Sequence, residues 1–74
     1  MSSEAAASPS IVVNGKAMPL TRDLSLRQLI ESLGMGQQAV AAEVNGKLVR
    51  RALHEATTLQ NGDHVELVSL IGGG

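Results

Sequence analysis

The sequence predicts one small α+β domain, in which a mixed sheet of four to five short strands carries a single helix on one face. Three observations predict this class. Three Asn-Gly pairs mark tight turns between apolar runs, because both residues tolerate positive φ. One segment repeats its apolar residues at helical spacing. The other apolar runs alternate as strands do. A length of 74 residues leaves room for one such domain.

The chain is expected to divide into three parts. Residues 1–9 are small and polar, with no basic or apolar stretch of a secretory signal, so we expect a disordered N-terminal tail or a remnant of expression. Residues 10–71 form the domain. Residues 72–74 are all glycine, and we expect them to be a flexible C-terminal tail.

The first turn, Asn14-Gly15, separates Ile11–Val13 from Lys16–Leu20 and predicts a β-hairpin. Because proline has no N–H to donate to a ladder, Pro19 places the second strand at a sheet edge. The residues expected to share the core-facing side of this hairpin are Ile11, Val13, Met18 and Leu20.

A helix is predicted to begin after Ser25, the N-cap, with Gln28 as its capping-box partner and Leu24 packed on Leu29 as a hydrophobic staple. Gly34 is placed to end the helix in a left-handed conformation, which would bring Met35 to Ile30. The predicted apolar stripe consists of Leu26, Leu29, Ile30 and Leu33. Its opposite face is polar, so the helix is expected to lie on a sheet with one side in water.

The second half of the chain predicts more strands. Alternation predicts a strand over Val40–Val44, and the turn at Asn45-Gly46 leads to a short strand at Leu48–Val49. A single helical turn is expected around Leu53. The third turn, Asn61-Gly62, precedes a last strand. We summarise the element order as ββαββ.

The last strand is predicted to span His64–Ile71 and to lie parallel to the first. Val65 and Leu67 face the core in this alternation. On the opposite face lie His64, Glu66, Val68 and Leu70. Val68 and Leu70 are therefore either ordinary exposed apolar surface or a docking patch, and Ile71 is the expected hinge between strand and tail.

Composition argues against several functions. The net charge of −1 and the absence of aromatic residues argue against a nucleic-acid partner. No apolar stretch approaches the roughly 20 residues of a membrane span, so no membrane partner is expected. There is no cysteine, which fits a reducing, cytoplasmic location. His54 and His64 have no further ligand at metal spacing, so no metal site is expected.

The glycine end suggests a function. Because glycine has no side chain, Gly72 and Gly73 can enter a slot that excludes other residues and deliver the carboxylate of Gly74. The adjacent pair Arg50-Arg51 is either a solvated loop or a contact for an acidic rim on a partner. No triad of catalytic residues is recognisable, so this chain is not expected to be an enzyme.

Three segments, in this order and with the glycine end, resemble the ThiS family of sulfur carriers in thiamine biosynthesis, which has the ubiquitin-like β-grasp fold. They are the opening Ile-Val-Val-Asn-Gly-Lys, the central Val-Asn-Gly-Lys-Leu-Val-Arg of residues 44–50, and residues 59–68 followed by Leu-Ile-Gly-Gly-Gly. The resemblance covers nearly all of residues 10–74. The N-terminal tail departs from the compact pattern of the family.

The resemblance implies a mechanism. A ThiF-like adenylating enzyme uses ATP to activate the carboxylate of Gly74, and a sulfur donor such as a cysteine desulfurase allows its conversion to a thiocarboxylate. A ThiG-like thiazole synthase receives the sulfur. No cofactor is expected on the chain itself, since ATP belongs to the partner. The alternatives are a carrier for molybdopterin, cysteine or tRNA thiolation, a ubiquitin-like protein modifier, and a plain interaction module.

Overall fold

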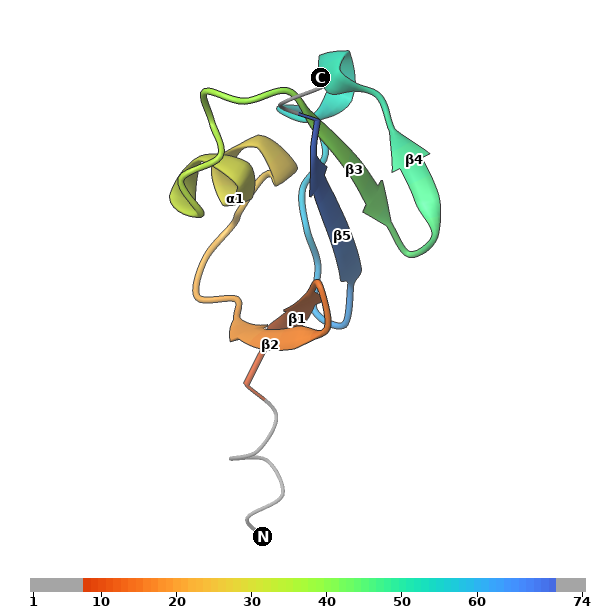
Figure 1. The fold of residues 1–74 in the computed structure, drawn as a ribbon. Coiled ribbons are helices and arrows are strands. Elements are labelled where there is room, and N and C mark those ends of the chain that lie inside the picture. Colours follow the sequence, from red (N-terminus) through yellow and green to blue (C-terminus); the bar gives the residue numbers. More distant parts are fainter. Residues whose placement is uncertain (1–7, 71–74) are drawn as a thin grey trace, which may run out of the picture.

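The computed structural model describes residues 8–70, which form a five-stranded sheet with one helix on one face (Figure 1). The strands are β1 (Ser10–Val13), β2 (Lys16–Pro19), β3 (Val40–Val44), β4 (Lys47–Val49) and β5 (His64–Ser69); the helices are α1 (Leu26–Ser32) and the 3-10 turn η2 (Arg51–Leu53). The sheet order is β2-β1-β5-β3-β4. The predicted fold class is confirmed, although the summary order ββαββ was one strand short.

The sheet is mixed because β1 and β5 run parallel, with Val12 opposite His64, while the other neighbours are antiparallel. The parallel pairing of the first and last strands is the one predicted. Pro19 lies in β2, an edge strand, as expected. The predicted domain boundaries stay predictions, because residues 1–7 and 71–74 lie outside the described range.

Two of the Asn-Gly pairs form hairpin turns in which both residues have positive φ: 49° and 85° at Asn14-Gly15, and 53° and 84° at Asn45-Gly46. Such turns match the twist of the strands that they join. At the third pair only Gly62 has positive φ. Its Asn61 side chain accepts a hydrogen bond from Ser10 N at 2.9 Å, so this turn fixes the start of β5 beside the start of β1.

Helix α1 has the predicted caps at both ends. Ser25 Oγ accepts from Gln28 N at 3.0 Å, and Gln28 Oε1 accepts from Ser25 N at 2.9 Å. At the other end Gly34 has φ of 78°, and Met35 N donates to Ile30 O at 3.1 Å, which is the predicted left-handed ending.

The core lies between α1 and one face of the sheet. Its buried apolar residues are Ile11, Val13, Leu26, Leu29, Ile30, Ala42, Leu59, Val65 and Leu67. Met18, Leu20 and Leu24 pack against it. The positions of Met18 and Leu20 agree with the predicted core-facing side of the hairpin, and the staple contact between Leu24 and Leu29 stays a prediction. Leu33 was wrongly placed in the apolar stripe. It caps the helix with φ of −90° and ψ of 7°, off the helical path, and is 41% exposed.

The ending at Gly34 makes a testable contribution to stability. A Cβ at this position would meet no atom within 4 Å, so the Gly34→Ala substitution creates no clash and adds only the strain of a left-handed residue. We expect the free energy of unfolding to fall by about 1 kcal/mol. Urea denaturation checks this, and Gly34→Asn should cost less because asparagine tolerates positive φ. Equal stability of the alanine variant and the parent would refute it.

Candidate functional site

The predicted reactive and tail residues, Gly72, Gly73 and Gly74, and the predicted hinge Ile71 lie outside the described residues. The structure describes the segment that leads to them. Leu70 N donates to Ala39 O at 2.8 Å, so the backbone pairing with the β3 side continues one residue beyond β5. Ser69 Oγ donates to Gln38 Oε1 at 2.6 Å. The domain therefore holds the chain as far as residue 70.

Four residues remain beyond this point, and a fully extended chain spans at most about 3.3–3.6 Å per residue. Residues 71–74 therefore add at most roughly 14 Å of chain beyond residue 70.

The face of the sheet opposite α1 is open. Along β5 the side chains alternate as predicted: Val65 and Leu67 are buried, whereas Val68 is 57% exposed. Leu70, just after the strand, is 55% exposed. Both predicted docking residues thus lie in the exposed part of the domain next to the root of the tail.

The register of the sheet places a further exposed apolar residue, Leu48, on the open face, where the sequence did not predict one. Glu43 is paired with Glu66 on one side and with Leu48 on the other, so these three side chains share the open face. Leu48 is 68% exposed. Ala41 is paired with Val68 on the same face. We call Ala41, Leu48, Val68 and Leu70 the open-face patch. The two-residue turn at Asn45-Gly46 was the signal that could have revealed Leu48, since it sets the register of β4.

Glu43 and Glu66 are directly opposite each other on antiparallel strands. Like charges at such positions destabilise a sheet. Within residues 8–70 the only ion pair joins Arg27 and Glu31, so neither of these two carboxylates forms an ion pair there. The open-face patch is thus flanked by negative charge that a basic surface would neutralise.

Neutralising one of these acids should stabilise the domain. We expect Glu66→Gln to raise the free energy of unfolding by about 0.2–1 kcal/mol at low ionic strength. The gain should shrink in high salt because the two carboxylates are exposed and therefore screened. Denaturation at two salt concentrations measures it, with Glu55→Gln as a control of equal charge change. An equal gain in the control would contradict the pairing explanation.

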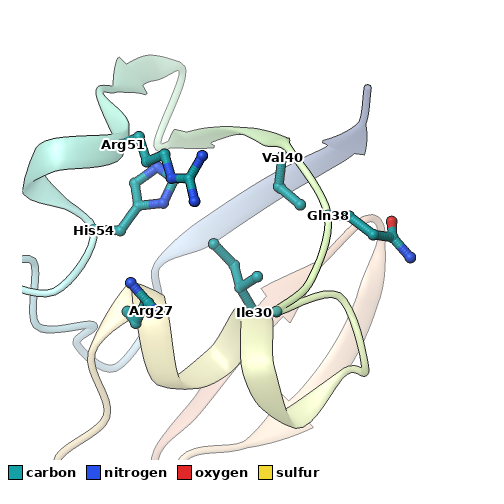
Figure 2. A pocket seen from close by; sticks show the side chains of 7 residues that line it. Arg27, Ile30, Gln38, Val40, Arg51 and His54 are labelled. Atoms are coloured by element: carbon teal, nitrogen blue, oxygen red, sulfur yellow. The ribbon is translucent and has the colours of Figure 1, made fainter. Parts of the chain in front are cut away.

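The two arginines predicted as a basic cluster follow β4. Arg50 is extended, with φ of −64° and ψ of 148°, and Arg51 begins η2. Only Arg51 lines a small pocket, together with Arg27, Ile30, Gly36, Gln38, Val40 and His54 (Figure 2). A docking role for either arginine stays a prediction.

His54 is a buried polar residue that the sequence reading did not foresee. It is 5% exposed, and its Nε2 lies 3.0 Å from Val49 O. Because a carbonyl oxygen only accepts, Nε2 carries the proton in this contact. The neighbouring Leu53 is 51% exposed, so the polar residue is inside and the apolar one outside. His64, by contrast, is exposed on the open face.

In the part of the chain that the structure describes, no group of three or more histidine, cysteine or acidic side chains is placed to hold a metal ion. No helix there is long and apolar enough to cross a membrane.

Comparison with known proteins adds to this geometry. A family model described as the ThiS family matches residues 11–74, which is most of the chain and includes the open-face patch and the glycine end. The chain belongs to the ThiS family. Membership supports a sulfur carrier, and it agrees with the β-grasp arrangement of helix and mixed sheet.

A solved structure supports the same assignment. The crystal structure of the thiamine biosynthesis protein ThiS from Geobacter metallireducens superposes with a TM-score of 0.73 at 34% sequence identity, over 88% of this chain and 99% of that one. It confirms the ubiquitin-like fold of this ThiS-family chain.

Two curated relatives differ in length. The uncharacterized protein ycf40 of Porphyra purpurea is 32% identical over 65 residues, which cover 88% of this chain and 92% of the relative. A thiazole synthase of Paramagnetospirillum magneticum is 30% identical over 64 residues, which cover 86% of this chain but 20% of the synthase. That enzyme therefore contains a ThiS-like region within a longer polypeptide.

Proposed function

We propose that this protein carries sulfur for the formation of the thiazole of thiamine, as a thiocarboxylate on Gly74. The observation that carries the proposal is the match to the ThiS family over residues 11–74, which ends on the glycine tail. In this proposal the chain is a cosubstrate of its partner enzymes and performs no catalysis itself.

The chemistry requires activation because a carboxylate is a poor electrophile. An oxygen of the Gly74 carboxylate attacks the α-phosphorus of ATP in a ThiF-like enzyme; pyrophosphate leaves, and an acyl-adenylate forms. A hydrosulfide ion then attacks the carbonyl carbon, the bond to AMP breaks, and the thiocarboxylate remains. If a persulfide from a cysteine desulfurase attacks instead, a thiol must afterwards cleave the sulfur–sulfur bond to release the same product.

The recipient that we propose is a ThiG-like thiazole synthase. The support is the synthase of Paramagnetospirillum magneticum, in which a ThiS-like region and the remainder of the enzyme belong to one polypeptide. A separate carrier would meet such an enzyme by diffusion, which requires a docking surface on its domain.

The glycine tail cannot supply this docking energy. Ordering each backbone residue costs roughly 1–2 kcal/mol, and glycines offer no side chain in return. The open-face patch is suited to offset the cost, since Val68 and Leu70 are exposed and adjoin the root of the tail. Burial of apolar surface contributes about 25 cal/mol per Å².

A charge in the open-face patch should therefore weaken docking without stopping the chemistry. We expect Val68→Glu to raise the KM for the carrier in the adenylation reaction at least about tenfold, because the interface would have to bury an unpaired carboxylate. The kcat should stay near that of the parent. Pyrophosphate release measures both constants.

The matched control is Leu33→Glu, which introduces the same charge at an exposed leucine on the helix side of the sheet. Its KM should stay close to that of the parent. If the two substitutions raised the KM equally, the open-face patch would have no specific role in docking.

A genetic test addresses the recipient. A strain that lacks its own thiazole sulfur carrier should grow without added thiazole when it expresses this chain. Growth only when thiazole is supplied, with thiocarboxylate present on the purified chain, would instead indicate a carrier for another recipient.

A further inference from the structure

The small pocket at the end of the domain where β5 finishes is formed by segments far apart in the sequence. Arg27 and Ile30 come from α1, Gln38 from the loop before β3, and Arg51 and His54 from the η2 region. Figure 2 shows Arg51 and His54 on one side of the pocket and Ile30 and Val40 on the other. We call it the arginine pocket.

Backbone hydrogen bonds fix the positions of the two segments that carry the arginines of this pocket, Arg27 and Arg51. At the start of α1, Leu26 N donates to Thr57 O at 2.8 Å, and Arg27 N donates to His54 O at 3.0 Å. These are N–H groups that have no partner within a helix. The beginning of α1 is therefore bonded to the segment that follows η2, which holds Arg27 and Arg51 around the same hollow.

The guanidinium groups keep unused donors. Arg27 donates through Nε to Glu31 Oε2 at 2.9 Å, and this exposed pair leaves its terminal amino groups available. Within residues 8–70 the Arg51 side chain makes no hydrogen bond or ion pair. Two cationic groups therefore border one pocket, and no acid lines it.

Size and charge limit what the pocket can bind. Its volume is about 20 Å³, room for one group of the size of a water molecule. Glu31 and Glu55 lie with Arg27 in the neighbouring hollow and offset part of the positive charge. A single oxygen of a singly charged group fits these limits better than a doubly charged phosphate. Guanidinium donors form strong, charge-assisted hydrogen bonds to a carboxylate oxygen.

The arginine pocket also adjoins the root of the tail. Val40 lines it and is paired with Ser69, the last residue of β5. An enzyme that takes up the tail has about 14 Å of chain to work with, so its rim must come close to this end of the domain.

We propose that the arginine pocket binds one carboxylate, supplied by an aspartate or glutamate side chain on the adenylating enzyme that takes up the tail. The source of the carboxylate rests on the proposed function, whereas its binding to the pocket does not. The pocket would thus orient the domain while the open-face patch supplies contact area.

The first experiment tests the pocket without any partner. Sodium acetate is titrated into the full isotope-labelled chain at constant ionic strength, and the side-chain NMR signals of Arg27, Arg51 and His54 are followed. We expect saturating shifts, and Arg51→Gln should weaken acetate binding at least about tenfold. Arg51→Lys keeps the positive charge, so this variant should bind acetate more tightly than Arg51→Gln does. Arg50→Gln removes the same charge from the neighbouring residue and should leave binding unchanged.

Three results would overturn the pocket assignment. Chloride could produce the same shifts as acetate, phosphate could bind more tightly than acetate, or Arg50→Gln could weaken binding as much as Arg51→Gln. Movement of the Arg51 and His54 signals on deletion of Gly73 and Gly74, with no acetate present, would assign the pocket to the chain's own terminus and overturn the partner as source.

The second experiment tests the source. With the adenylating enzyme, Arg51→Gln should raise the KM for the carrier about tenfold at unchanged kcat. Arg22→Gln removes the same charge from an exposed arginine that does not line the pocket, and it should leave the KM unchanged. An unchanged KM together with saturable acetate binding would overturn the proposed source alone. If the unsubstituted chain supports no pyrophosphate release, the proposed function fails, and this result is distinct from either failure of the pocket.

Discussion

A chain that lacks Gly73 and Gly74 is expected to fold like the parent and to lose adenylation by the partner enzyme completely. The backbone pairing described for the domain reaches Leu70, before the deleted residues, so the hydrogen bonds among residues 8–70 are kept. The new terminal carboxylate would lie about 7 Å short of the position that Gly74 reaches, because each extended residue spans about 3.3–3.6 Å. Release of pyrophosphate from ATP measures the loss.

A second variant separates reach from bulk. Gly73→Val keeps the length of the tail but adds a branched side chain, and it should lower kcat/KM strongly if the slot admits only glycine. Circular dichroism and urea denaturation of both variants should match the parent, since neither position belongs to the described core. A deletion variant adenylated at the parental rate would contradict the role assigned to Gly74.

The second large effect concerns stability. Leu29→Ala should lower the free energy of unfolding by about 2–5 kcal/mol. The reason is that the Leu29 side chain, on the sheet-facing side of α1, is fully buried in the core, so its truncation leaves a cavity. A core of this size rarely supplies more than about 3–5 kcal/mol in total. The variant should therefore be largely unfolded at room temperature, as urea denaturation and amide dispersion in NMR would show.

The matched control for this truncation is Leu48→Ala. It removes the same atoms from a side chain that is 68% exposed, so it should change the free energy of unfolding by less than about 0.5 kcal/mol. A cooperative unfolding transition for Leu29→Ala at the parental urea midpoint would contradict the core described for this domain.

The elements with local chemical signals were the predictable part of the fold. Ser25 and Gln28 form the expected capping box, and Gly34 ends α1 in the expected conformation. Asn14-Gly15 and Asn45-Gly46 form the expected turns. In each case the deciding interaction lies within a few residues, so the sequence alone contains it.

Features that depend on distant segments were missed or misplaced. His54 is buried where the start of α1 is hydrogen-bonded to the segment around residues 54–57, an arrangement that no local pattern in the sequence indicates. Leu33 leaves the apolar stripe because the helix ends before it.

For the candidate site, alternation along one strand was enough to predict the exposure of Val68 and Leu70. The opposed pair Glu43 and Glu66 could not be found this way, because it depends on the register of β5 beside β3. The arginine pocket likewise requires α1 and η2 to meet in space.

In the proposed function, the carboxylate of Gly74 becomes a thiocarboxylate. The most direct test is the intact mass of the full chain after incubation with an adenylating enzyme, ATP and a sulfur donor, followed by the mass of its C-terminal peptide. We expect a gain in mass equal to the exchange of one oxygen for one sulfur, located on that peptide. An unchanged mass, while the same enzyme converts its own carrier in a parallel reaction, would contradict it.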